Sequence, residues 1–446
     1  MQKTLIKNAS IVNEDEIFVG DVLIEGQFIT LIDRNIDADN STKVIDAEGL
    51  YLFPGIIDDQ VHFREPGLTH KDEIYTESKS AVAGGVTSYM EMPNTQPQST
   101  TIVELEKKYL RAAECSLANY SFFMGGTNTN LDEIQKVDYS KVCGLKLFMG
   151  SSTGDMLVDN ITTLEKIFSS VNALIATHCE NDAMVKKNTK KIMEEYGEDI
   201  PAYFHPIIRN EDVCYTSSKM AVDLAKKYNT RLHILHISTA KELSLFDNKL
   251  PLKEKRITAE ACIHHLWFSD EDYAAKGNFI KWNPAIKTAY DRDKIFEAVL
   301  DGRIDVIATD HAPHTIEEKQ QSYLKAPSGG PLIQHSLQAM IDFYHQKKIS
   351  LESIVKKMSH NVADLFAIDK RGYIRESYYA DLVLVNLNKP LTVNKSNLLY
   401  KCGWSPFEGH TFKSSIEKTF VNGHLVYNSG QFDENNKGMR MTFRKN

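Results

Sequence analysis

The central part of the chain, residues 54–371, alternates short apolar segments with longer amphipathic ones, and this alternation constrains the fold most. The amphipathic segments, such as TIVELEKKYLRAAE and DRDKIFEAVL, carry apolar residues at three- and four-residue spacing, which is typical of helices. The eight apolar segments are predicted strands: GIIDDQVHF, VTSYMEMP, NYSFFMGG, GLKLFMG, ALIATHCE, RLHILHIS, RITAEACIHH and IDVIATDHAP. Eight strand–helix units predict an α/β fold, a parallel (β/α)8 TIM barrel with catalytic groups at the C-terminal strand ends.

The two ends of the chain, residues 1–53 and 372–446, have a different pattern. Both are rich in short strand-like segments separated by turns, and residues 1–53 show no amphipathic helix. Asn422-Gly423 separates two such segments and is a favoured two-residue hairpin turn. The sequence therefore predicts one small β-sandwich domain that both chain ends build beside the barrel.

The composition limits the partners and the location. A net charge of -8 and a pI near 6.0 argue against nucleic acid or an anionic membrane as a partner. No apolar run approaches the roughly 18 residues of a membrane-spanning helix, and the first residues lack the apolar core of a signal peptide. The six cysteines form no CxxC pair, which is typical of reduced thiols. We expect a cytoplasmic protein.

The first predicted strand lies in the segment PGIIDDQVHFREPG, residues 54–67. Because side chains alternate along a strand, Asp58, Gln60 and His62 are predicted to share one face. Asp59 and Val61 are predicted to point the other way. The strand therefore presents polar groups at its C-terminal end, where a barrel places its site.

Polar residues recur at the ends of the predicted strands. His62 ends the first strand, Lys146 lies on the fourth, His178 on the fifth, His236 on the sixth and Asp310 ends the eighth. Unrelated core residues are not expected to fall at these positions together. Imidazole nitrogens and carboxylate oxygens suit Zn²⁺ or a similar divalent ion, so we interpret the group as a metal site.

Several motifs resemble those of dihydroorotases, which are cyclic amidohydrolases of the metal-dependent amidohydrolase superfamily. They are VHFREPG, MPNT, GLKLF, HCEN, LHIS, NPAIK and ATDHAPH, and the resemblance extends along nearly the whole chain. It implies a zinc-dependent enzyme with one or two ions per subunit. The implied reaction is the reversible cyclisation of N-carbamoyl-L-aspartate to L-dihydroorotate with loss of water, a step of pyrimidine biosynthesis.

The resemblance also assigns roles to residues. The implied metal ligands are His62, Lys146, His178, His236 and Asp310. Lys146 would act as a carbamate: burial should lower its pKa, and a neutral amine can take up CO2. The alternative is an ammonium that extends out of the barrel end. Asp310 is the implied catalytic residue, which takes a proton from metal-activated water and passes it to the leaving nitrogen.

The resemblance implies a substrate that carries a carboxylate. Arg64 is expected to hold that carboxylate with its planar guanidinium, while a surface ion pair with Glu65 is the alternative. The further implied substrate-binding residues are Asn94, Asn283, His314, Ser328 and Gly329. Residues 311–331 form a long loop, which we hypothesise closes over the substrate.

Gln60 departs from the family motif, which has a histidine at this position. A glutamine offers only a neutral carbonyl oxygen, a poor zinc ligand beside imidazole. Asp59 is not expected to replace it, since it is predicted to lie on the wrong face. We therefore predict that the ion served by His62, Lys146 and Asp310 is held more weakly than its neighbour.

The remaining histidines are not predicted ligands. His233 lies three residues from His236 and is expected to face the opposite side of the strand, as a core or helix-facing residue. His311 is expected to pack or hydrogen-bond. His264 and His265 are neighbours that cannot share a face. A structural or solvated role is expected for His70, His205, His335, His360, His410 and His424.

Other functions stay open at this stage. One alternative is a sibling activity, hydantoinase/dihydropyrimidinase or allantoinase. Another is a non-catalytic homologue that serves as a structural subunit for another pyrimidine enzyme, supported only by Gln60. The sequence also leaves a homodimer, and an association with another enzyme of the pathway, undecided.

Overall fold

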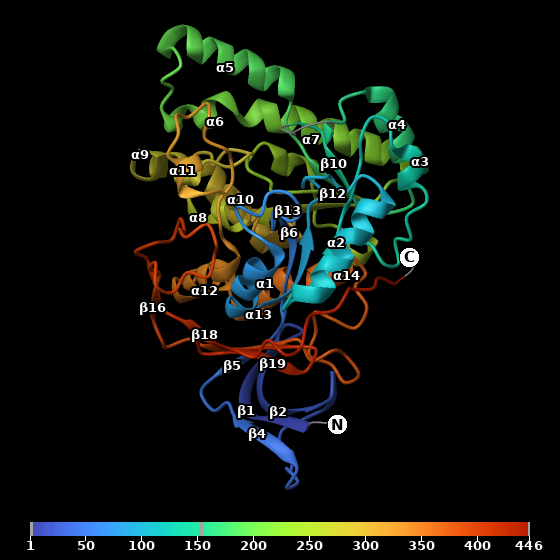
Figure 1. Ribbon diagram of the computed structural model, residues 1–446, viewed down its shortest axis with the longest axis vertical. Coiled ribbons are helices and arrows are strands. Elements are labelled where there is room, and N and C mark those ends of the chain that lie inside the picture. The colour runs from blue at the N-terminus through green and yellow to red at the C-terminus, as the bar shows by residue number, and fades with distance from the viewer. Residues whose placement is uncertain (1–2, 151–155, 445–446) are drawn as a thin grey trace.

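The computed structural model describes residues 3–150 and 156–444. Parallel strands form a barrel that helices surround (Figure 1). The barrel strands are β6 (Ile56–Val61), β7 (Val86–Glu91), β8 (Asn119–Phe122), β9 (Met124–Gly125), β10 (Leu145–Phe148), β11 (Ile175–His178), β12 (Leu232–Ile234), β13 (Ile257–Cys262) and β14 (Val306–Ala308).

These strands close into a ring of eight positions, as the sequence predicts. One sheet has the order β6-β7-β8 and a second has the order β9 to β14. Strands β8 and β9 are separated by a single residue and together form the third position. The ring closes between β6 and β14, where the His62 N–H donates to the His311 carbonyl over 2.7 Å.

Amphipathic helices cover the outside of the barrel. In α2, for example, Leu105, Tyr109 and Ala112 follow the predicted spacing and are buried, while Thr101 caps the first turn by accepting from the Glu104 N–H. The helices are α1 (Ile74–Ala83), α2 (Ile102–Cys115), α3 (Leu131–Ile134), α4 (Ile161–Ser170), α5 (Asp182–Tyr196), α6 (His205–Ile208), α7 (Glu211–Tyr228), α8 (Ile263–Trp267), α9 (Tyr273–Lys276), α10 (Ala289–Asp301), α11 (Ile316–Lys319), α12 (Ser336–His345), α13 (Leu351–Val355) and α14 (Asn361–Leu365). Within the described ranges, none is long and apolar enough to span a membrane.

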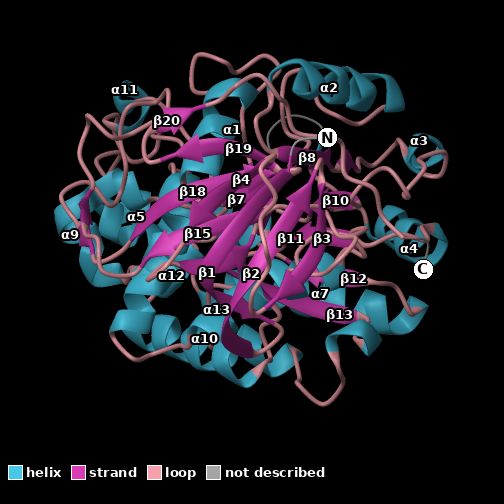
Figure 2. Cartoon of the chain, turned by 90° about the horizontal axis from the view of Figure 1, so that it is seen from below, coloured by secondary structure: helices cyan, strands magenta, loops and turns pink. Residues whose placement is uncertain are grey.

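Both chain ends build one β-sandwich-like unit, which confirms that part of the predicted fold. Its strands lie together at one end of the molecule, the N-terminal ones blue and the C-terminal ones red (Figure 1), and Figure 2 shows them from below. They are β1 (Lys3–Asn13), β2 (Glu16–Glu25), β3 (Phe28–Asp33), β4 (Thr42–Asp46), β5 (Tyr51–Pro54), β15 (Leu382–Asn386), β18 (Ser415–Val421), β19 (His424–Asn428) and β20 (Gln431–Phe432). A separate two-stranded pair joins β16 (Leu391–Thr392) and β17 (Thr411–Phe412).

The order of this sheet interleaves the two ends of the chain. It runs β20-β19-β18-β15-β5-β1-β2-β3, with β4 paired to the start of β1, so β5 lies between β1 and β15. Asn422 and Gly423 have φ angles of 51° and 76°, as the predicted hairpin turn between β18 and β19 requires. The unit has its own apolar core, which includes Ile11, Leu52 and Leu384.

Strand β6 does not alternate regularly, and the structure corrects one prediction here. Asp58 pairs with Tyr89 and Val61 with Glu91, so three steps along β6 match two along β7 and the strand bulges. In this bulge Asp59 turns to the inside of the barrel, where its Oδ2 lies 3.3 Å from Nε2 of His233 on β12. Strands β14 and β13 separate β6 from β12, so the contact crosses the barrel interior. The predicted direction of Asp59 is therefore wrong.

Candidate active site

The sequence-predicted site residues line one cavity of about 370 Å³ at the C-terminal ends of the barrel strands. Three of them, Arg64, His236 and Asp310, lie two or three residues after the ends of β6, β12 and β14 and have positive φ angles of 71°, 39° and 48°. Such backbone strain is typical of functional sites. The predicted residues in the lining are Gln60, His62, Arg64, Asn94, Lys146, His178, His236, Asn283, Asp310, His314, Ser328 and Gly329.

His178 and His236 form the most preorganised part of the site. Nδ1 of His178 lies 3.0 Å from Nε2 of His236, and both side chains are buried. Nε2 of His178 lies 2.9 Å from Oε2 of Glu180, which also accepts from Arg209 over 2.6 Å. A carboxylate that fixes one ring nitrogen leaves the other nitrogen as a ligand, which is the usual arrangement around a metal-binding histidine. The sequence analysis did not single out Glu180 or Arg209.

Lys146 is buried in the same cavity, and its Nζ lies 4.6 Å from the centre of the Phe148 ring. No ion pair between Lys146 and a carboxylate is found among the described residues. Burial lowers the pKa of Lys146 to about 7. A large share of neutral amine at neutral pH follows, which is the form that reacts with CO2.

His62 and Asp310 lie beside each other in the same cavity. Nε2 of His62 lies 3.3 Å from Oδ1 of Asp310, and its Nδ1 lies 2.8 Å from Oδ1 of Asn94. Asn94 thus orients His62 in addition to its predicted place beside the substrate. Burial raises the pKa of Asp310 to about 7, so this carboxyl exchanges a proton readily near neutral pH.

The side-chain amide of Gln60 contacts two neighbouring protein side chains. Its Nε2 donates to Oδ1 of Asp310 over 3.2 Å, and its Oε1 lies 3.6 Å from the thiol of Cys262. This arrangement is compatible with the predicted weakness of Gln60 as a ligand. An ion held beside His62 would have to compete with both contacts.

Arg64 and His314 lie together on one wall of the cavity. Nη2 of Arg64 lies 3.1 Å from Nε2 of His314, and Nε of Arg64 donates to the Pro313 carbonyl over 2.9 Å. The alternative pairing of Arg64 with Glu65 does not form, because Glu65 pairs with Arg111 over 2.7 Å. Burial, followed by the charge of Arg64, lowers the pKa of His314 well below its usual range, so the imidazole is neutral.

Two buried lysines that the sequence analysis missed hold the loop of residues 311–331. Nζ of Lys319 donates to the carbonyls of Pro327 and Gly329, and Nζ of Lys281 donates to those of Tyr323 and Ala326. Their partners are backbone groups of the loop, so no sequence motif marks them. The loop is thus fixed against the barrel in this structure.

Gly329 fits this loop for a steric reason. Its φ is 128°, and a Cβ atom there would lie 2.4 Å from the Ala312 carbonyl oxygen. The neighbouring Ser328 carbonyl lies 3.0 Å from Nε2 of His314. Asn283 completes this wall of the cavity.

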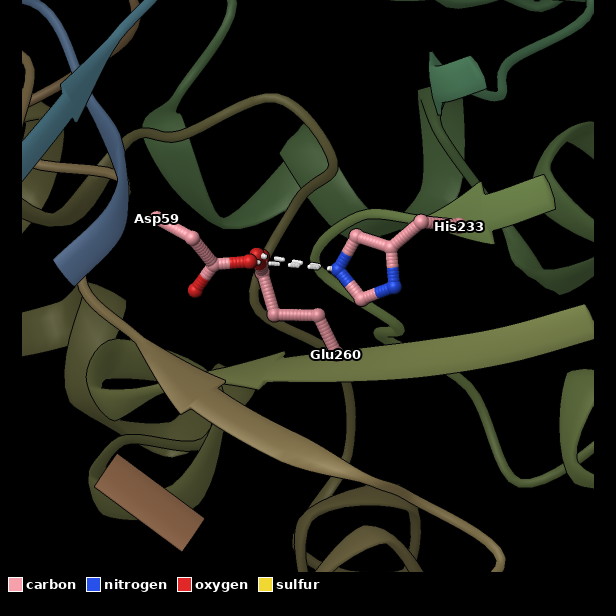
Figure 3. Close-up of side chains that lie close together, drawn as sticks. All are labelled: Asp59, His233 and Glu260. Carbon is pink, nitrogen blue, oxygen red and sulfur yellow. Dashed lines mark ion pairs between the residues drawn. The ribbon is translucent and has the colours of Figure 1, made fainter. Parts of the chain in front are cut away.

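His233 is buried in the core as predicted, but it does not face the helices. Its ring meets Asp59 and Glu260 inside the barrel (Figure 3). The reason is that β12 ends at Ile234, so the alternation of side chains along the strand does not extend as far as His236. His311 packs and hydrogen-bonds, its Nδ1 accepting from the Leu332 N–H over 3.0 Å, and His264 stacks on Trp282, which itself lines the cavity.

Comparison with known proteins identifies the family. The sequence profile of the amidohydrolase family matches residues 51–426. This chain belongs to the amidohydrolase family. It is 31% identical to a dihydroorotase of Clostridioides difficile over 438 residues, which cover 95% of this chain and 100% of that protein. It is 30% identical to an allantoinase of Desulfitobacterium hafniense over 437 residues, 96% of either protein.

Solved structures confirm the amidohydrolase barrel. An L-hydantoinase (dihydropyrimidinase) from Arthrobacter aurescens has a TM-score of 0.91 at 25% identity, covering 99% of this chain and 100% of that one. A dihydropyrimidinase from Brevibacillus agri has a TM-score of 0.90 at 24% identity and covers 100% of both chains. The relatives thus establish a cyclic amidohydrolase, and they are named for different activities.

The donor groups of this amidohydrolase fit the divalent metal on which the family generally depends. His178 and His236 direct ring nitrogens toward the same point, 3.0 Å apart, and Glu180 fixes the first ring from behind. Lys146, His62 and Asp310 line the same cavity. Nitrogen and oxygen donors of this kind suit Zn²⁺ and similar ions.

Proposed function

We propose that this protein is a dihydroorotase, which interconverts N-carbamoyl-L-aspartate and L-dihydroorotate. The observation that carries the proposal is the buried guanidinium of Arg64, which faces the cavity beside the candidate metal ligands. Its hydrogen bonds go to the Pro313 carbonyl and to His314, and no carboxylate pairs with it among residues 3–150 and 156–444.

A buried arginine without a counterion favours an anionic ligand. Burial lowers the pKa of Arg64 to about 10, which measures the cost of holding this charge away from water. A substrate carboxylate would supply the missing negative charge and accept parallel N–H bonds from the guanidinium. The neighbouring Lys71, whose Nζ lies 2.9 Å from Nδ1 of His314, is itself paired with Glu318 over 3.1 Å. Both the open and the cyclic form of the proposed substrate carry such a carboxylate.

The remaining residues supply positions for the chemistry. We propose that His62, Lys146, His178, His236 and Asp310 hold one or two zinc ions, and that Lys146 does so as a carbamate. Bound zinc would supply a Lewis acid and lower the pKa of water. Asp310, with its pKa near 7, holds or releases the proton that the ring nitrogen gains or loses. Arg64 and Asn94 would orient the substrate, in a cavity that Trp282 and Phe148 also line.

The runner-up functions are hydantoinase and allantoinase, which the names of the relatives suggest. The ring substrates of these activities do not require an arginine such as Arg64 in the cavity wall. A non-catalytic homologue is the third candidate. Its support is Gln60, whereas a scaffold would not need Lys146 and Asp310 to be buried around one cavity.

The test is turnover by the purified chain with three substrates side by side: L-dihydroorotate, allantoin and hydantoin. Zinc content is measured in the same samples. We expect ring opening of dihydroorotate that a chelator abolishes and zinc restores. Turnover of allantoin or hydantoin alone would replace the proposal with a sibling activity. Full zinc content without any turnover would favour the non-catalytic homologue.

A further inference from the structure

A second group of potential metal ligands lies inside the barrel, beneath the cavity. Asp59 on β6, His233 on β12 and Glu260 on β13 point toward one another (Figure 3). Nε2 of His233 lies 3.3 Å from Oδ2 of Asp59 and 3.6 Å from Oε2 of Glu260. All three side chains are 0% exposed. None of them lines the cavity of the candidate active site.

The group lacks partners that would satisfy it as it stands. Both carboxylate oxygens of Asp59, Oε2 of Glu260 and Nε2 of His233 are buried without a hydrogen bond in the described part of the chain. No lysine or arginine forms an ion pair with either carboxylate there. Buried carboxylates without partners are costly, so something must compensate them.

Hydrogen bonding to His233 directs the ring nitrogen that faces the carboxylates. Nδ1 of His233 lies 2.9 Å from Oγ1 of Thr258, and that hydroxyl donates to the Leu232 carbonyl over 3.2 Å. The hydroxyl proton is thus engaged, so Nδ1 must be the donor to Oγ1. In a neutral ring this leaves a lone pair on Nε2 directed at two carboxylates. A positive charge must compensate them, either a proton on Nε2 or a cation between the three groups.

A proton on Nε2 would compensate the group incompletely. It could bond one of the two carboxylates, and the other would stay buried and unpaired. Both distances also exceed the roughly 2.7–2.9 Å of a charge-assisted hydrogen bond. Ligands about 2.0–2.1 Å from a tetrahedral ion are separated by about 3.3 Å, close to the spacing found here.

We propose that this chain holds a structural divalent ion, Zn²⁺ or an ion of similar preference, between Asp59, His233 and Glu260. Two carboxylates and a neutral imidazole balance its charge. Glu260 is positioned for the role, because its other oxygen accepts from the His236 N–H over 2.9 Å. The bulge in β6 that carries Gln60 is also what turns Asp59 inward. The chain thus gains a ligand beside the position at which the family's histidine is lost.

The burial of the site distinguishes this ion from those of the cavity. Because its ligands are fully enclosed, it must bind as the barrel folds and should exchange slowly. His233 pairs with Ala176 on β11, two residues before the cavity ligand His178, so the ion lies one layer deeper. Chelators should reach the cavity first.

The first experiment measures zinc in purified protein after prolonged dialysis against a chelator, with dihydroorotate turnover followed in parallel. We expect wild type to lose turnover and yet retain about one zinc per chain, whereas Asp59→Asn retains none. The control is Glu91→Gln, which removes another fully buried carboxylate, the partner of Lys108 at 2.9 Å. It should lower stability and leave the retained zinc unchanged. Equal zinc retention by Asp59→Asn and wild type would overturn the proposal.

A second experiment does not require a folded variant. Crystals of the zinc-grown wild type, measured at the zinc absorption edge, should show an anomalous peak bonded to Nε2 of His233. Peaks confined to the cavity of Lys146 and His178 would overturn the inference. Neither the retained zinc nor the anomalous peak depends on which substrate the enzyme uses, so the proposed function and this proposal, which does not rest on it, fail separately.

Discussion

The guanidinium of Arg64 lies 3.1 Å from Nε2 of His314, whose Nδ1 lies 3.5 Å from Oε2 of Glu318. Because burial and Arg64 keep His314 neutral, its Nε2 can accept a hydrogen bond from Arg64 and help to fix the orientation of the guanidinium. Arg64 therefore presents its remaining N–H groups in a fixed direction, which is what recognition of a planar carboxylate requires.

Arg64→Lys keeps the positive charge and removes the planar guanidinium. We expect the KM for N-carbamoyl-L-aspartate to rise about 10- to 100-fold, which corresponds to about 1.4–2.7 kcal/mol of a charge-assisted pair. Steady-state kinetics measure this. The control is Arg111→Lys, since Arg111 is 42% exposed and pairs with Glu65 outside the cavity. An unchanged KM in Arg64→Lys would contradict the assignment of the carboxylate to this wall.

Glu180→Gln should weaken metal binding although Glu180 does not line the cavity. Burial alone would raise the pKa of Glu180, but Arg209 and His178 outweigh it and lower that pKa below its usual range, so the residue is a carboxylate. Losing this charge behind His178 should reduce zinc affinity by about 10- to 100-fold.

Competition with a chromogenic chelator measures this affinity. Glu165→Gln, which removes a surface partner of Lys227, is the matched control. If zinc affinity is equal in both variants, the orienting role of Glu180 is wrong.

Gln60→His should strengthen the binding of the ion that we propose beside His62. The new imidazole replaces an amide that now contacts Asp310 and Cys262, and it adds a better zinc donor than a carbonyl oxygen. We expect zinc titration to show a tighter second cavity site than in wild type. Gln60→Met has similar length without a comparable donor and serves as the control. Two equally tight cavity sites in the wild type would contradict the prediction.

Lys281 should link stability to pH. Burial lowers its pKa from the usual value of 10.5 to about 7 in the folded chain. Between these values the unfolded chain binds the extra proton, so the free energy of unfolding rises with pH by up to about 1.4 kcal/mol per unit. This contribution is lost as the pH falls to 7.

Relative to Lys281→Met, wild type should therefore gain on the order of 2 kcal/mol between pH 7 and 9. Urea unfolding at the two pH values measures this difference. Lys186→Met is the control, because that side chain is 78% exposed. A difference between wild type and Lys281→Met that is constant with pH would refute the linkage.

Gly329→Ala should displace the loop of residues 311–331. The added Cβ would meet the Ala312 carbonyl oxygen, and φ at this position is 128°. We expect a higher KM and a loss of roughly 1–3 kcal/mol in stability, because His314 contacts the neighbouring Ser328 carbonyl. Gly430→Ala, at φ 92° with nothing within 4 Å, controls for backbone strain alone. Equal effects in the two variants would show that the close contact is unimportant.

Much of the fold follows from the sequence because its signals are local and repeated. The strand–helix alternation predicted the barrel, and Asn422-Gly423 predicted the hairpin in the terminal sheet. The candidate site residues could be picked out because a parallel barrel brings all its C-terminal strand ends together. Their roles as ligands stay predictions.

What the sequence could not predict depends on irregular pairing or on backbone partners. Asp59 was assigned the wrong direction because a two-residue period assumes a regular strand, and β6 bulges. His233 lies in the core as predicted, but its direction could not be counted from His236 because β12 ends at Ile234. Lys281 binds carbonyl oxygens of the loop of residues 311–331 and Lys319 binds carbonyl oxygens within that loop, and carbonyls carry no sequence signature.

The position of β5 between β1 and β15 has a consequence for how the protein is made. On the ribosome, β5 emerges with the first strands, but its second neighbour belongs to the far end of the chain. One edge of β5 therefore stays unpaired while the entire barrel is translated, and an open edge invites pairing with other chains. Nascent chains that stall before β15 should thus be the aggregation-prone species, whereas the released chain covers that edge itself.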